Sequence, residues 1–126
     1  SILVRIEVAV SLALRAQSLP EVITLIENHI GNSVDACQSV PAAIGLFVFS
    51  KGDPFEAIVG GTNIGNDTDT IAAIAGALAG ALGGVDALPQ SMYDTFCRAN
   101  ADDEFDIEEL AMGLTRIASS NEGGVS

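Results

Sequence analysis

The spacing of apolar residues predicts a chain made of helices. Along most of its length apolar side chains recur at the period that places them on one face of a helix. No stretch shows the alternation typical of a strand, and the sequence contains no internal repeat. The fold class that follows is all-α. The expected helices cover, approximately, residues 2–16, 20–29, 33–50, 54–60, 69–82, 90–99 and 106–118.

Proline and glycine mark the expected boundaries between these helices. Pro20 opens the second helix, and Gly31–Asn32 ends it. The segment Lys51–Pro54 combines a glycine that ends one helix with an aspartate and a proline that start the next. Pro41 falls inside the third predicted helix, where proline costs about 3 kcal/mol. We therefore expect a kink or the start of a new helix at that point.

Two of the predicted helices are unusually apolar. The helix over 2–16 is apolar on nearly every side, which predicts that it is buried. The helix over 69–82 is rich in alanine and glycine, whose small side chains let neighbouring backbones approach closely. We place this helix at the centre of an orthogonal or irregular bundle. Its apolar run is shorter than the roughly 20 residues that cross a bilayer, so no membrane span is expected.

The length of 126 residues suits one domain. We expect residues 1–118 to form part of a single all-α domain, and the polar, glycine-rich residues 119–126 to form a flexible tail. The chain begins at Ser1 inside an apolar helical pattern, with no initiator methionine and no cap before it. The expectation is therefore a part of a longer polypeptide.

The charge balance is strongly acidic and limits the classes of partner. The formal net charge is −12, with 17 acidic residues against 5 lysines and arginines, so no basic patch is available for nucleic acid. An anionic ligand would need a bound cation or helix N-termini, which makes a metal site more plausible. The two cysteines, Cys37 and Cys97, without a secretory signal indicate a reduced, cytoplasmic protein.

The strongest candidate for chemistry is Gly65–Thr70, the GNDTDT segment, which the expected loop over 61–65 delivers to the start of the fifth helix. Asp67, Asp69 and Thr70 carry the hard oxygen ligands that Mg²⁺, Mn²⁺ or Ca²⁺ prefers. The alternative is that Asp67 or Thr68 only caps the helix, because a helix start favours such residues. An ordinary EF-hand does not fit this spacing. The residues alone leave the metal site and the cap open.

Other polar and aromatic residues have ordinary structural explanations. The single histidine, His29, lies near a helix end, where a cation suits the dipole, and neither cysteine has a histidine nearby in sequence. The acidic run at 102–109 is interpreted as a solvated first helical turn rather than a second metal site. Tyr93, Phe96 and Phe105 are expected to be core or lid residues.

The residues around the GNDTDT segment resemble the carboxy-terminal half of the ADP-ribosylglycohydrolase family, which includes dinitrogenase reductase-activating glycohydrolase. The agreement is ordered over roughly residues 35–90, and the core Gly-Asn-Asp-Thr-Asp-Thr-Ile is highly specific. Three stretches carry it: Ser39–Phe47, Gly52–Ile58 and Asn63–Ala81.

The resemblance implies an all-α bundle with a binuclear Mg²⁺ or Mn²⁺ centre that receives a ribose of ADP-ribose. The positions that match the family's metal ligands are Asp67, Asp69 and Thr70, with Asp69 expected to bridge the ions, and the two aspartates are the expected catalytic carboxylates. The implied substrate is an ADP-ribosylated protein or an ADP-ribose-containing small molecule. The ions would supply the positive charge that the sequence lacks.

The sequence departs from the family pattern in one important respect. The family takes its other metal ligands, a Thr-Asp-Asp motif and a glutamate, from an amino-terminal half, and no such motif occurs here. A missing amino-terminal segment or a separate chain is therefore expected to complete the site. The expected function is a hydrolase of ADP-ribosyl N- or O-glycosidic bonds. The alternatives are a non-catalytic binding or structural protein of the same fold, and a helical domain merely stabilised by Ca²⁺ or Mg²⁺.

Overall fold

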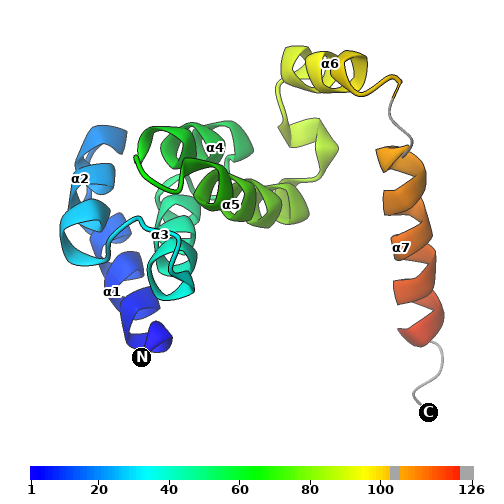
Figure 1. The fold of residues 1–126 in the computed structure, drawn as a ribbon. Coiled ribbons are helices and arrows are strands. Elements are labelled where there is room, and N and C mark those ends of the chain that lie inside the picture. The colour runs from blue at the N-terminus through cyan, green and yellow to red at the C-terminus, as the bar shows by residue number, and fades with distance from the viewer. Residues whose placement is uncertain (103–105, 123–126) are drawn as a thin grey trace. The chain divides into compact units, whose positions relative to one another are not determined.

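The computed structural model describes residues 1–102 and 106–122, which form α-helices, one short 3₁₀ helix and no strand. The predicted all-α class is therefore confirmed (Figure 1).

The chain divides into two compact units, Ser1–Gln90 and Ser91–Ser126. No helix within the described residues is long and apolar enough to cross a membrane. In chain order the elements are α1 (Ile2–Arg15), α2 (Leu19–His29), α3 (Ala36–Phe49), α4 (Pro54–Asn63), α5 (Thr68–Gly83), η1 (Val85–Ala87), α6 (Gln90–Ala99) and α7 (Ile107–Glu122).

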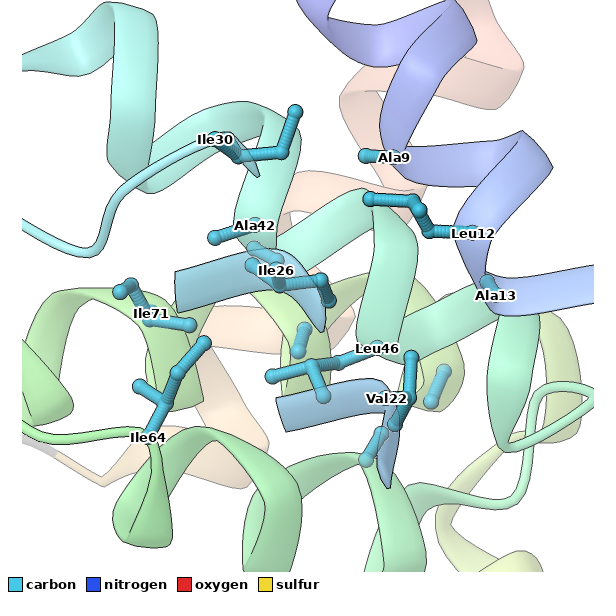
Figure 2. Packing of buried hydrophobic residues seen from close by; sticks show 14 residues of the cluster. Ala9, Leu12, Ala13, Val22, Ile26, Ile30, Ala42, Leu46, Ile64 and Ile71 are labelled. Carbon is cyan, nitrogen blue, oxygen red and sulfur yellow. The ribbon is translucent and has the colours of Figure 1, made fainter. Parts of the chain in front are cut away.

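Helix α3 organises the first unit, because α1, α2, α4 and α5 all pack against it. Leu46 on α3 is fully buried together with Val22 and Ile26 of α2 (Figure 2). These two residues form the buried side of α2. Pro41 lies inside one continuous helix that begins at Ala36, so of the two predicted alternatives the start of a new helix is wrong, and the kink stays a prediction.

Helix α1 is buried on one side only. Its buried residues are Ala9, Leu12 and Ala13, whereas Leu3 and Leu14 remain 68% and 72% exposed. The prediction that this helix is buried all round is therefore wrong for the chain in this structure. The physical reason is that, within the described residues, α1 packs mainly against α3 with a smaller contact to α2, and its buried side carries Ala9, Leu12 and Ala13.

Helices α4 and α5 form a close pair that carries the GNDTDT segment between them. Helix α4 continues to Asn63, beyond the predicted end at Gly60, which shortens the connection. The continuation passes through Gly61, which is buried against α5. A Cβ atom at Gly61 would lie 2.4 Å from the Cα atom of Ala72, so the absence of a side chain permits this approach.

Side-chain caps fix the starts of two helices, and the one at Asp53 was predicted from the sequence. The Ser18 hydroxyl accepts a hydrogen bond from the Glu21 N–H at 3.3 Å at the start of α2. An Asp53 carboxylate oxygen accepts one from the Glu56 N–H at 2.7 Å at the start of α4. Each cap satisfies a backbone donor that a helix start leaves without a partner.

The second unit contains most of α6 and all of α7. Helix α7 continues to Glu122, so it includes residues 119–122 of the segment predicted as a flexible tail. Residues 123–126 lie outside the described part of the chain, as do Phe105 and two acids of the 102–109 run. The Asp106 carboxylate accepts a hydrogen bond from the Glu109 N–H at 3.1 Å, which fits the interpretation of that run as a first helical turn.

Candidate active site

The GNDTDT segment is anchored in the core at both ends. Ile64 immediately precedes it and Ile71 immediately follows it, and these side chains are 2% and 0% exposed. Figure 2 shows both isoleucines directed into the apolar cluster of the first unit. Burial of two large side chains this close in sequence holds the intervening turn against the bundle.

The turn itself depends on two consecutive residues with left-handed backbones. Gly65 has φ 83° and Asn66 has φ 50°, and helix α5 starts two residues later. Glycine adopts such angles without steric cost, and asparagine tolerates them better than most other residues. These two residues reverse the chain so that the segment from Asp67 onward enters the helix.

Asp67 occupies the N-cap position of α5 and yet makes no side-chain cap hydrogen bond. It is only 8% exposed, which is unusual for a carboxylate. Asp69 lies in the first helical turn, and both Asp69 and Thr70 are exposed. The alternative in which Asp67 merely caps the helix therefore lacks its defining hydrogen bond. That the three side chains converge on one ion stays a prediction.

The electrostatic setting of these carboxylates is the start of a sixteen-residue helix. The unpaired N–H groups at a helix start carry partial positive charge and stabilise nearby anions. Among the described residues no group of three or more His, Cys, Asp or Glu side chains is placed to hold an ion.

Asn32 is a site residue that sequence reasoning missed. It was interpreted only as the end of the second helix, but its side chain is 5% exposed and reaches across to the GNDTDT segment. Its Nδ2 donates to the Ile64 carbonyl at 2.7 Å, and its Oδ1 accepts from Asn66 Nδ2 at 2.7 Å. The only signal in the sequence was a polar residue directly after Gly31, which is too common to indicate such a role.

The other residues considered in the sequence lie away from the GNDTDT segment in the chain. His29 is exposed at the end of α2, and Cys37 and Cys97 are free and exposed. Tyr93 and Phe96 of the second unit line a cavity of about 370 Å³ together with residues of α7, and Phe96 is 44% exposed. The Tyr93 hydroxyl donates a hydrogen bond to Glu108.

Comparison with protein families identifies the chain's relatives. The sequence model for ADP-ribosylglycohydrolase matches residues 3–123, nearly the whole chain. The chain belongs to the ADP-ribosylglycohydrolase family. The match extends well beyond the residues 35–90 that carried the resemblance.

Several curated proteins are similar to this chain. It is 30% identical over 122 residues to the uncharacterized protein YegU of Escherichia coli, covering 97% of this chain and 36% of that protein. It is 36% identical over 100 residues to the human ADP-ribosylhydrolase ARH3, covering 71% of this chain and 26% of that protein. The zebrafish ARH3 is 35% identical over 115 residues, which cover 83% of this chain and 30% of the relative. The chain thus spans about a third or less of these relatives. No solved structure matches it.

Proposed function

We propose that the chain supplies one wall of the active site of a hydrolase that removes ADP-ribose from a protein or small-molecule acceptor. Membership of the ADP-ribosylglycohydrolase family supports this proposal, as do relatives named ADP-ribosylhydrolase. The single observation that carries it is Asp67, a residue only 8% exposed at a helix start, whose carboxylate is not used as a cap. A carboxylate on a residue held against the core, without that capping task, is a good candidate for a metal ligand.

The proposed metal ligands are Asp67, Asp69 and Thr70, in a binuclear Mg²⁺ or Mn²⁺ centre. Their carboxylate and hydroxyl oxygens suit these hard ions, whereas the chain offers few cationic side chains to hold a diphosphate or ribose. Three protein donors are fewer than an octahedral ion requires. Donors from elsewhere in the protein, from substrate or from water would complete the coordination.

The reaction adds water across the bond between the anomeric carbon of the ribose and its acceptor. The water oxygen bonds to that carbon, and the acceptor leaves with a proton. When bound by Asp67, Asp69 and Thr70, divalent ions would supply positive charge beside the water and the ribose hydroxyls. Asp67, held at the start of α5, fixes the position of the centre. Asp69, which is exposed in the first turn of α5, would act with Asp67 as a catalytic carboxylate by holding the ions beside the attacking water.

The rest of the site is proposed to come from outside these 126 residues. The chain covers about a third or less of its curated relatives, and it has no Thr-Asp-Asp motif. An amino-terminal segment or a separate chain would contribute the opposite wall of the site. In the first case this chain is the carboxy-terminal portion of the protein. We therefore expect these residues in isolation to be inactive.

A second candidate is a non-catalytic member of the family that binds ADP-ribose. The observation that favours it is that the sequence contains no Thr-Asp-Asp motif to complete a metal site. One result separates the two candidates. A hydrolase cleaves ADP-ribose from its acceptor, whereas a binding protein binds ADP-ribose and leaves that bond intact.

The test uses the complete protein and acceptor proteins that carry ADP-ribose on arginine or on serine. We expect release of free ADP-ribose, and we expect Asp69→Asn to reduce the rate at least 100-fold. The control is Glu27→Gln, which removes an exposed carboxylate from α2 and should leave the rate unchanged. Binding of ADP-ribose without release from either acceptor would favour the non-catalytic candidate.

A further inference from the structure

The turn that presents Asp67 is held by one side chain from a distant part of the sequence. Asn32 precedes α3, yet it contacts residues on both sides of Gly65 through its side-chain amide. Its backbone carbonyl also accepts a hydrogen bond from the Asp67 N–H at 3.1 Å. We propose that Asn32 is a positioning residue for the metal ligands of the GNDTDT segment. This inference rests on the proposed function of that segment.

The first contact of Asn32 provides a hydrogen-bond donor for a backbone carbonyl at the end of α4, which has no partner within the helix. Ile64 is the C-cap of α4, and its carbonyl accepts from Asn32 Nδ2 at 2.7 Å. The last carbonyls of a helix have no intrahelical donor, and a buried one without a partner is costly. The contact therefore fixes where α4 ends and where the turn begins.

The second contact holds a residue in an unfavourable backbone conformation. Asn66 has φ 50°, a region that non-glycine residues rarely adopt. Its Nδ2 donates to Asn32 Oδ1 at 2.7 Å. Together with the bond between the Asn32 carbonyl and the Asp67 N–H, this contact sets the backbone direction immediately before Asp67.

The position of Asp67 is thus set through its backbone, because its carboxylate makes no cap bond that would orient it. A metal ligand binds best when its supporting hydrogen bonds hold it near the required geometry before the ion arrives. Asn32 provides this support from a buried location, at 5% exposure, where water competes weakly for its hydrogen bonds.

Asn32 is itself held in place by the turn in which it lies. Gly31 precedes it with φ 90°, and the Gly31 N–H donates to the Ile26 carbonyl at 3.0 Å. The Ser33 N–H that follows it donates to Gln38 Oε1 at 3.2 Å. Both neighbours of Asn32 are therefore tied to helices of the first unit, so the contact to the GNDTDT segment starts from a fixed point.

The experiment measures two properties of the complete protein in wild-type, Asn32→Ala, Asn66→Gly and doubly substituted forms. Asn66→Gly removes the partner amide without straining a positive φ, so it is expected to fold. The control is Asn28→Ala, the same substitution at an exposed position of α2. Hydrogen–deuterium exchange of residues 65–70 is measured without metal, and Mn²⁺ affinity is measured by calorimetry.

We expect Asn32→Ala to speed exchange across residues 65–70 about tenfold, with residues 75–80 of α5 unchanged. The Mn²⁺ dissociation constant should rise about 10–100-fold, as is typical when the support of a ligand is removed. Once Asn32 is alanine, Asn66→Gly should add little further loss, because the shared contact is already gone. Coupling of the two substitutions in Mn²⁺ affinity, and not in exchange alone, is the result that a purely structural role would not produce.

Failure of the role of Asn32 and failure of the proposed metal site would give different results. Wild-type protein that binds Mn²⁺, with Asn32→Ala binding equally well and exchanging at the same rate, would overturn the role of Asn32 alone. Wild-type protein that binds no Mn²⁺ under conditions where it is folded would overturn the proposed metal site, and the positioning role would fall with it.

Discussion

The side chains of Asn32 and Asn66 are joined by a 2.7 Å hydrogen bond, although 34 positions separate them in the sequence. This bond links the connection between α2 and α3 to the turn between α4 and α5. The GNDTDT segment is therefore not a free loop. Its ends are buried through Ile64 and Ile71, and its middle is tied to a third part of the bundle.

Replacing Asp67 should separate metal binding from stability. Asp67→Asn keeps the shape of the side chain but removes its charge. Because this side chain makes no cap hydrogen bond, the free energy of unfolding should change by less than about 1 kcal/mol. Mn²⁺ affinity of the complete protein should fall at least tenfold. Urea denaturation and calorimetry measure the two quantities, and a large loss of stability with unchanged affinity would assign Asp67 a structural role.

Gly61 and Gly80 should respond to alanine in opposite directions. At Gly61 the added Cβ atom would lie 2.4 Å from the Ala72 Cα atom, so α4 must move away from α5. We expect Gly61→Ala to lower the free energy of unfolding by about 1–3 kcal/mol. At Gly80, inside α5, nothing lies within 4 Å of the added atom. Gly80→Ala should stabilise the protein by about 0.5–1 kcal/mol through helix propensity, and denaturation of both variants tests the pair.

Asp53 and Asp35 offer a matched test of helix capping. Both precede a helix, but only the Asp53 carboxylate accepts a cap hydrogen bond, at 2.7 Å from the Glu56 nitrogen. Asp53→Ala should therefore cost about 0.5–2 kcal/mol, and Asp35→Ala clearly less. Thermal unfolding of the two variants at equal protein concentration provides the comparison. Equal losses would mean that the cap bond of α4 contributes nothing measurable.

Local patterns in the sequence were sufficient to predict most of the helices. The start of α2 around Pro20, the boundary at Asp53 and Pro54, and the GNDTDT segment at a helix start could all be recognised from short-range spacing. Such features depend on residues close in sequence, and the physical preferences that govern them are local.

What the sequence could not predict depends on contacts between distant residues. The extension of α4 through Gly61 requires the close approach of Ala72, which outweighs the poor helix propensity of glycine. The exposed side of α1 is largely apolar, as its buried side is. Local spacing therefore does not indicate which side packs against the other helices. Asn32 has no distinguishing local signal, because its role depends on Ile64 and Asn66.

The central claim is that Asp67, Asp69 and Thr70 form one wall of a two-ion site. Calorimetric titration of Mn²⁺ into the metal-free complete protein tests it most directly, with Asp69→Asn measured beside the wild type and Glu27→Gln as the control. We predict two bound ions per molecule in the wild type and in Glu27→Gln, and the loss or at least tenfold weakening of both in Asp69→Asn, because Asp69 is expected to bridge them. Mn²⁺ binding that Asp69→Asn leaves unchanged would contradict the account.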